Sequence, residues 1–197
     1  MAQTFSAQNN PQAEKVLNTL LNDAKTTAIR SNFTMTIKDK KNTQTAAGNF
    51  TLKGNKFVLD MIEMKVWFDG KTQWSLIVPS KEVSISEPSE KELAETNPMA
   101  ILSGFKAKST IQFSQKTKSK QNHCIELTPK IANKDLAKIE VQVNKTNNNI
   151  VSIRITNKNG STSLLSLNNF QKGIKVADNI FTFNAAKHKG VLVNDLR

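Results

Sequence analysis

The chain has 197 residues, carries a formal net charge of +12, and is 38% hydrophobic. This length fits one domain, or at most two small ones. No apolar run approaches the roughly 20 residues that a transmembrane helix needs, so we expect none. The chain begins without the basic segment and apolar run of a secretory signal, so we expect a mature form from which the signal peptide is absent.

The positive charge comes almost entirely from lysine. Lys and Arg total 28, and Arg30, Arg154 and Arg197 are the arginines, which leaves 25 lysines. Recognition of bases and phosphates favours the guanidinium fork of arginine, so we predict no nucleic-acid partner. Two explanations of the lysines stay open: solubility with protection of sheet edges, or attraction to an anionic surface.

No motif of an enzyme is present. The sequence lacks a Gly-x-Ser-x-Gly elbow, a P-loop and a dinucleotide glycine pattern. His123 and Cys124 are adjacent, so on a strand they would point to opposite faces, and His188 has no partner at ligand spacing. The single cysteine rules out an internal disulfide. We therefore predict no catalysis, no metal site and no cofactor.

The first predicted element is a helix that follows a disordered leader at residues 1–9. Asn10 before Pro11 is a helix N-cap followed by proline at the first helical position. One apolar stripe then recurs at helical spacing. Its members are Val16, Leu17, Leu20, Leu21, Ala24 and Ala28.

Alternation of period two begins at Phe33 and indicates about ten short strands. Their apolar positions fall within residues 33–37, 48–52, 57–61, 64–68, 74–78, 83–85, 109–113, 125–127, 139–143, 151–155, 165–167, 181–183 and 191–193. Asp69-Gly70 and Asn159-Gly160 are hairpin turns. Such a series is typical of a barrel or sandwich.

The strand pattern breaks after residue 86, and Asn97-Pro98 begins a second, short helix that is apolar on nearly every side. Two helices are too few to bury a broad sheet. A curled sheet with helices plugging one opening satisfies both observations.

Four segments carry a family resemblance: GNFTLKGNKF at 48–57, FDGKTQW at 68–74, LTPK at 127–130 and FTFNAAKHKGVLV at 181–193. In this order they resemble the outer-membrane lipoprotein carrier protein family, LolA. The resemblance implies one domain over residues 1–197. It implies a mainly β (α+β) fold: an unclosed, strongly curved, antiparallel, barrel-like sheet with helices forming a lid over an apolar cavity.

The resemblance also implies a function. The family consists of periplasmic chaperones that carry acylated lipoproteins from an inner-membrane ABC transporter to an outer-membrane acceptor. We therefore expect a periplasmic, monomeric carrier that binds the lipid moiety of lipoproteins. The alternative is a lipid-sensing or general lipid-binding module on the same scaffold.

Two departures mark a divergent branch. Lys53-Gly54 stands where the family commonly has an arginine before a proline, and Ala185-Ala186 replaces paired prolines. Lysine keeps the charge but loses the planar fork. The resemblance assigns partner contact and release to Lys53 and Phe57.

The predicted cavity combines apolar strand positions with flexible methionines, which fill irregular shapes. Its predicted lining is Leu20, Phe33, Met35, Phe50, Phe57, Leu59, Met61, Val66, Phe68, Trp74 and Leu76, and its predicted lid is Met99, Ile101, Leu102 and Phe105. Met64 is a further candidate. The competing interpretation is that these residues form an ordinary closed core.

Overall fold

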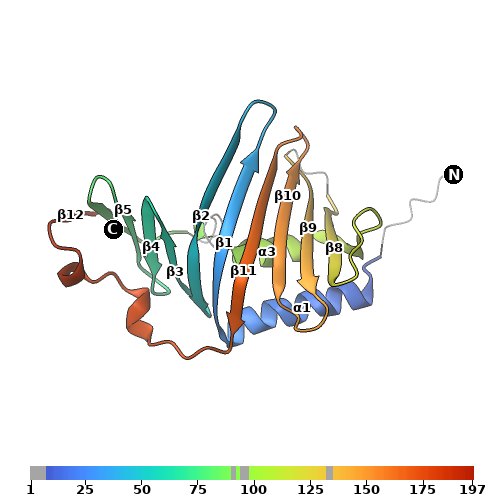
Figure 1. Cartoon of the computed structure of the whole chain (residues 1–197), viewed down its shortest axis with the longest axis horizontal. Helices are drawn as coiled ribbons and strands as arrows, with labels where there is room; N and C mark the ends of the chain where they lie inside the picture. Colours follow the sequence, from blue (N-terminus) through green and yellow to red (C-terminus); the bar gives the residue numbers. More distant parts are fainter. Residues whose placement is uncertain (1–7, 90–91, 94–97, 132–134) are drawn as a thin grey trace. The chain divides into compact units, whose positions relative to one another are not determined.

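The computed structural model describes residues 8–89, 92–93, 98–131 and 135–197, with only the backbone described at 98, 100 and 101 (Figure 1). The elements, with η for 3-10 helices, are α1 (Pro11–Thr26), β1 (Ala28–Lys38), β2 (Thr43–Lys53), β3 (Lys56–Met61), β4 (Met64–Phe68), β5 (Gln73–Ile77), β6 (Glu82–Ser86), α3 (Pro98–Ala107), β7 (Ser109–Phe113), β8 (Asn122–Pro129), β9 (Leu136–Asn144), β10 (Ile150–Asn157), β11 (Thr162–Lys172), η1 (Asp178–Phe181), η2 (Ala185–Lys187) and β12 (Leu192–Asp195).

The described strands form one open sheet of 12 strands in the order β12-β6-β5-β4-β3-β2-β1-β11-β10-β9-β8-β7. Neighbours from β2 to β6 and from β7 to β11 pair antiparallel, whereas β12 pairs parallel to β6. The mainly β, unclosed sheet is therefore confirmed. The expectation of purely antiparallel pairing is wrong at β12. The lid over a cavity stays a prediction.

The chain groups into two compact units. The first comprises residues 1–21, 35–44 and 102–166, and the second comprises residues 22–34, 45–101 and 167–197. None of the helices in the described part of the chain is long and apolar enough to cross a bilayer.

The first unit has a closed core on one face of its strands. The register aligns Ile111 with Leu127, Leu127 with Ile139, and Ile125 with Val141, and all five side chains are buried. Figure 1 shows α1 and α3 on the same side of β8–β10. The opposite face is polar, and there Lys138 lies 2.8 Å from a carboxylate oxygen of Glu126. This unit is an ordinary two-layer packing of helices on a sheet.

The N-terminus of α1 is fixed as the sequence predicts. The Asn10 side-chain oxygen accepts hydrogen bonds from the backbone N–H groups of Gln12 and Ala13, both at 3.0 Å. The Asn10 N–H donates to the Ile111 carbonyl at 2.8 Å, and the Ile111 N–H donates to the Asn9 side chain at 3.0 Å. Residues 9 and 10 therefore cover part of the β7 edge. Of the predicted leader, residues 1–7 lie outside the described residues.

Local predictions hold in most places. Gly70 and Gly160 have φ of 105° and 86° in the two predicted turns. His123 pairs with Val143 and Cys124 with Gln142, so the two side chains do point to opposite faces.

Three local predictions are wrong. Ala28, predicted on the apolar stripe of the helix, lies beyond the end of α1 at Thr26 and instead begins β1. The predicted strand at 181–183 is instead the end of η1 and a connection to η2. A register shift between Ile150 and Ser152 places Ile150, rather than Val151, in the buried core.

The cap on α1 gives a first test. Replacing Asn10 by Ala should lower the free energy of unfolding by about 1 kcal/mol, because two N–H groups lose their acceptor. Asn10→Asp, which keeps the acceptor and suits the helix dipole, should cost nothing. Chemical denaturation of both variants measures this. Equal losses in the two variants would contradict the capping role.

Candidate functional site

The candidate site is one face of β2–β4 in the second unit. Directly paired residues of an antiparallel sheet point to the same side. The register pairs Leu52 with Phe57, Phe50 with Leu59, and Gly48 with Met61. It then pairs Phe57 with Phe68 and Leu59 with Val66. We call this surface the apolar face; its members are Phe33, Phe50, Leu52, Phe57, Leu59, Met61, Met64, Val66 and Phe68.

Aromatic rings organise the apolar face. The rings of Phe57 and Phe68 lie 5.4 Å apart between centroids, and those of Phe33 and Phe50 lie 6.5 Å apart. Gly48 lies beneath this cluster. A Cβ atom there would meet the Met61 Cγ at 2.9 Å and the Phe33 Cε1 at 3.0 Å. Glycine therefore allows Phe33 and Met61 to approach the backbone of β2 closely.

The side chains of the apolar face become less buried from Phe57 and Phe68 toward Met61 and Met64. Phe33, Phe57, Val66 and Phe68 are buried. Phe50, Leu59, Met61 and Met64 are only partly buried.

The exposure continues past the strand ends. Ile62, in the turn after β3, is 88% exposed, and Ile77, which pairs with Met64, is 43% exposed. The Val78 N–H donates to the Glu63 carbonyl at 2.9 Å, which holds this turn beside the end of β5. The face therefore ends in solvent-accessible methionine and isoleucine side chains.

The opposite face of the same strands is sealed. Trp67, Leu76 and Val83 form its buried cluster, against which Val58, Trp74, Val78, Phe183 and Val191 pack. The indole of Trp67 makes edge contacts with Phe183 and with His188, each at 5.4 Å. The C-terminal segment 177–191 thus supplies the cover. We call this surface the sealed face.

This arrangement corrects the predicted lining. Trp74 pairs with Trp67, and Leu76 pairs with Val83. Both side chains therefore belong to the sealed face, opposite to Leu59 and Val66. The error arose because both faces of β4 carry large apolar residues, so the alternation of Trp74 and Leu76 in β5 did not show which of the two faces they join.

The other predicted residues are placed as follows. Leu20 is buried in the first unit, and Met35 is partly buried at the end of β1 that belongs to that unit. In α3, Met99 and Leu102 are buried and Phe105 is partly buried. The Ile101 side chain lies outside the described residues. The lid role of α3 stays a prediction.

Lys53 has a partner that sequence reasoning missed. Its Nζ lies 2.6 Å from one carboxylate oxygen of Asp178, and the Lys56 Nζ lies 2.7 Å from the other. The two lysines lower the pKa of Asp178 to about 2 through their hydrogen bonds and charges. No local signal links β2 to a residue 125 positions away. This bridge attaches the C-terminal segment to the β2–β3 hairpin.

The site offers contact with apolar groups and little other chemistry. Within the described residues, no group of three or more His, Cys, Asp or Glu side chains could hold a metal ion. Burial raises the pKa of the Cys124 thiol, which disfavours the reactive thiolate. Burial, and then the charge of Lys145, lower the pKa of His123.

The sequence pattern of the family described as outer membrane lipoprotein carrier protein LolA matches residues 23–184. The chain belongs to this family. The match includes every strand that forms the apolar face. No protein of curated function matches the sequence.

Solved structures share the fold at low identity. An uncharacterized conserved protein from Thermus thermophilus is 8% identical, with a TM-score of 0.62 over 93% of this chain and 99% of the other. MucB is 12% identical, with a TM-score of 0.54 over 89% of this chain and 64% of MucB. A DUF1329 family protein from Desulfovibrio piger is 10% identical, with a TM-score of 0.50 over 90% and 99%. These likenesses show the LolA-like fold and nothing finer.

Gly48 tests the close packing of the apolar face. We expect Gly48→Ala to lower the free energy of unfolding by about 2–3 kcal/mol, because the new methyl group collides with the Asp60 carbonyl oxygen and crowds Met61 and Phe33. In Gly104→Ala a Cβ meets nothing within 4 Å. That helix position should gain up to about 1 kcal/mol. Thermal unfolding of both variants is the measurement, and a harmless Gly48→Ala would refute the packing described.

The Asp178 bridge predicts a pH dependence. Because the pKa in the folded chain, about 2, lies below the ordinary 3.8, the bridge is fully present above about pH 4. It is lost as the pH falls through about 2. Trp67 packs on the segment that the bridge attaches, so tryptophan fluorescence should change over this range. At neutral pH, Asp178→Asn should already have the tryptophan fluorescence that the parent shows in acid. The fluorescence of Asp195→Asn should change with pH as that of the parent does. A parent-like Asp178→Asn would exclude the bridge as an attachment.

Proposed function

We propose that this protein is a periplasmic carrier that binds the acyl chains of lipoproteins on the apolar face and shuttles them from an inner-membrane ABC transporter to the outer membrane. The observation that supports this most is the partial exposure of Phe50, Leu59, Met61 and Met64. In an ordinary core, aromatic and aliphatic side chains at the centre of a sheet would be buried, as Ile125 and Val141 are in the first unit.

The free energies fit acyl chains. Burying one methylene group contributes about 0.8 kcal/mol, so a few methylenes per chain already give useful affinity. A carrier must also release its cargo, and a surface that stays partly open binds less tightly than an enclosed cavity. Met61 and Met64 suit this task, because a thioether side chain adapts to ligands of irregular shape.

The sealed face makes the apolar face available. The segment 177–191 covers Trp67, Leu76 and Val83, so the sheet is packed from that side. The strands can then stay ordered without complete burial of their other side. This division of roles within one sheet supports binding as the function of the apolar face.

The handover partners belong to the same proposal. Lys53 is 45% exposed and shares Asp178 with Lys56. A transporter or acceptor that offers a carboxylate could exchange with Asp178, because exposed ion pairs of this kind are weak. In this way Lys53 would take the place of the family arginine without its planar fork.

A charge on the apolar face tests the proposal. Leu59→Glu should weaken binding of a fluorescent fatty acid and of a triacylated lipopeptide by about 30-fold or more, because the carboxylate must be desolvated against the chain. The matched control is Asn49→Glu, which places the same charge on the opposite side of β2. There Asn49 is exposed and pairs with Asp60, which already has Lys65 as its ion-pair partner at 3.0 Å, so the added carboxylate stays in solvent and touches no residue of the apolar face. We expect parent-like binding in this control.

The outcomes separate the candidates. Unchanged binding in a folded Leu59→Glu variant would exclude the apolar face as the acyl site. Equal binding of free phospholipid and of lipopeptide would favour a general lipid-binding module instead. Release of lipopeptide to outer-membrane vesicles, but not of phospholipid, would favour the carrier.

A further inference from the structure

The net charge is concentrated in the first unit. That unit contains 15 Lys and Arg against 5 Asp and Glu, a net +10, whereas the second unit contains 13 against 11, a net +2. The apolar face belongs to the nearly neutral unit. The excess charge therefore calls for a separate explanation.

Six lysines of the first unit gather at one end of its strands. We call this surface the lysine rim; its members are Lys38, Lys40, Lys41, Lys108, Lys130 and Lys158. All six side chains are exposed. Within the described part of the chain, none of them forms an ion pair.

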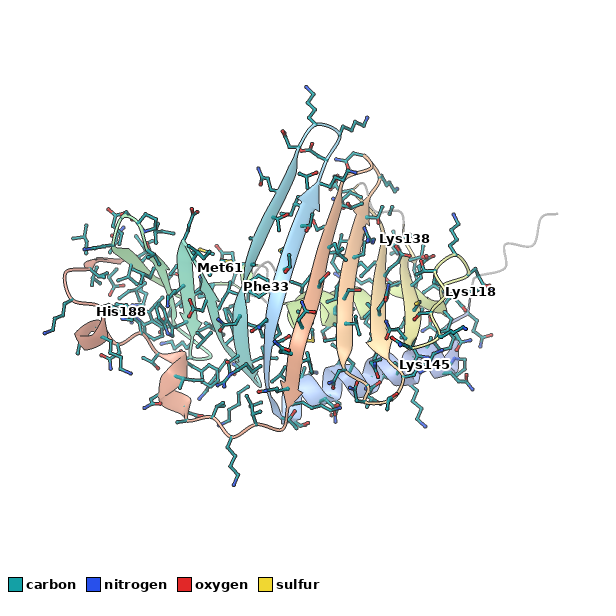
Figure 2. The ribbon with its side chains drawn as sticks, viewed as in Figure 1. Phe33, Met61, Lys118, Lys138, Lys145 and His188 are labelled. Atoms are coloured by element: carbon teal, nitrogen blue, oxygen red, sulfur yellow. The ribbon has the colours of Figure 1, made fainter. Side chains whose placement is uncertain are left out.

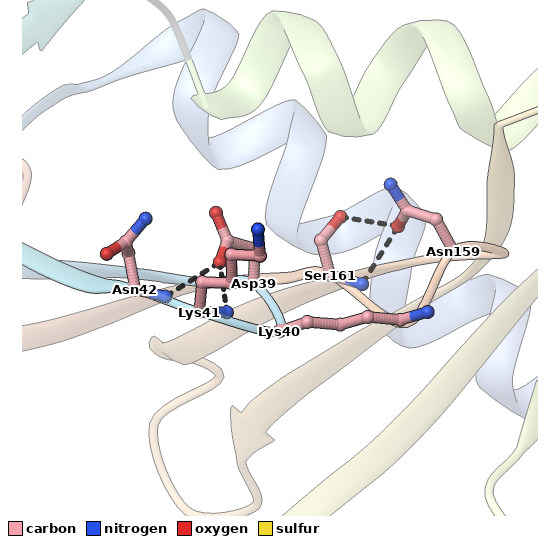
Figure 3. Close-up of a pocket in the computed structure, with 6 residues that line it drawn as sticks. All are labelled: Asp39, Lys40, Lys41, Asn42, Asn159 and Ser161. Atoms are coloured by element: carbon pink, nitrogen blue, oxygen red, sulfur yellow. Dashed lines mark hydrogen bonds between the residues drawn. The ribbon is translucent and has the colours of Figure 1, made fainter.

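Backbone hydrogen bonds join the loops of the rim. The Lys130 N–H donates to the Lys108 carbonyl at 2.9 Å, and the Lys158 N–H donates to the Asp135 carbonyl at 2.7 Å. The turns at 39–42 and 159–161 together line an open hollow of about 320 Å³ (Figure 3). Figure 3 shows the Lys40 side chain extending toward the turn at Asn159. The lysines therefore share one continuous surface. With strands about 4.8 Å apart, it extends roughly 25–30 Å.

The nearby acidic residues, Asp39 and Asp135, offset only part of this charge, because they are two against six lysines. Asp39 accepts hydrogen bonds from the backbone N–H groups of Lys41 and Asn42, both at 2.7 Å, and these bonds lower its pKa. Its carboxylate thus serves to close the turn. The rim keeps a clear positive excess.

The same rim exposes two large aliphatic side chains. Ile37 near the tip of β1 is 45% exposed, and Ile131 after β8 is 83% exposed. Nucleic acid offers such residues no partner, and lysine lacks the fork used for base and phosphate recognition. Cationic side chains together with exposed apolar ones match the interface of an anionic bilayer instead.

We propose that the lysine rim docks the protein on the surface of a bilayer that contains anionic phospholipid. The lysines are attracted to the headgroups, and Ile37 and Ile131 enter the interface. This contact uses no residue of the apolar face and extends the proposed function. It would bring a carrier to the membrane at which cargo is loaded or delivered.

The test compares two triple variants in sedimentation with vesicles of phosphatidylcholine containing 30% phosphatidylglycerol at 0.15 M salt. Lys40→Glu, Lys41→Glu and Lys158→Glu together should weaken vesicle binding by about 100-fold.

The matched control changes Lys116, Lys118 and Lys120 to Glu, with the same change of net charge. These residues lie at the other end of the strands, where the Lys145 Nζ donates to the carbonyls of Ser119 and Lys120, both at 3.1 Å (Figure 2). The Debye length at this salt is about 8 Å, so we expect the control to lose less than about 5-fold.

Equal losses in the two triple variants would overturn the proposal, because net charge alone would then drive binding. Vesicle binding that survives the rim variant would overturn it too, as would tighter binding of duplex DNA than of vesicles at the same salt. Ile131→Ser should reduce vesicle binding about 3- to 10-fold and leave DNA binding unchanged, and no effect on vesicles would refute insertion. Fatty-acid binding, measured in the same variants, should stay at the parent level. Among these variants and Leu59→Glu, we expect only Leu59→Glu to lose fatty-acid binding. The proposal of membrane docking can therefore fail or hold independently of the proposed acyl-chain site.

Discussion

The second unit depends on one constraint: its sheet carries large apolar side chains on both faces, and the C-terminal segment covers one of them. In β4, Val66, Trp67 and Phe68 are consecutive and all buried, although neighbouring side chains point to opposite sides. Segment 177–191 packs on the Trp67 side through Phe183 and Val191. The other side is left with a gradient from buried Phe57 and Phe68 to accessible Met61 and Met64.

The two units therefore differ in how they bury the apolar side chains of their strands. The first pairs an apolar sheet face with a polar one, and its ion pairs and hydrogen bonds, such as Lys138 with Glu126 and Asn122 with Gln142, lie on the polar side. Along β3 and β4 the second unit carries large apolar side chains on both faces, and the Asp60–Lys65 ion pair lies beside the sealed face. An exposed apolar surface costs free energy and favours aggregation, and this is the reason for proposing a ligand on it. The positive charge of the first unit would limit self-association through repulsion.

Sequence reasoning recovered the elements better than their partners. The N-cap at Asn10, the turns at Gly70 and Gly160 and most strand positions follow from local rules of capping, positive φ and alternation. The side of the sheet to which Trp74 and Leu76 belong does not follow from such rules. It is set by their register with β4, and β4 is apolar on both sides. The Asp178 bridge and the parallel pairing of β12 depend on contacts across more than 100 residues, which no local pattern contains. In the sequence, the lysines of the rim are scattered. Only the backbone hydrogen bonds of Lys108 and Lys158 in the structure show that they lie on one surface.

The most direct test of the central claim is methyl NMR of the methionines, which number only 5. Titration with a triacylated lipopeptide should shift the ε-methyl signals of Met61 and Met64, since these side chains lie at the accessible end of the apolar face. The indole N–H signal of Trp67, on the sealed face, should stay in place. Shifts at Trp67 with unmoved Met61 and Met64 signals would show that lipid enters on the other side of the sheet, and would contradict acyl-chain binding on the apolar face.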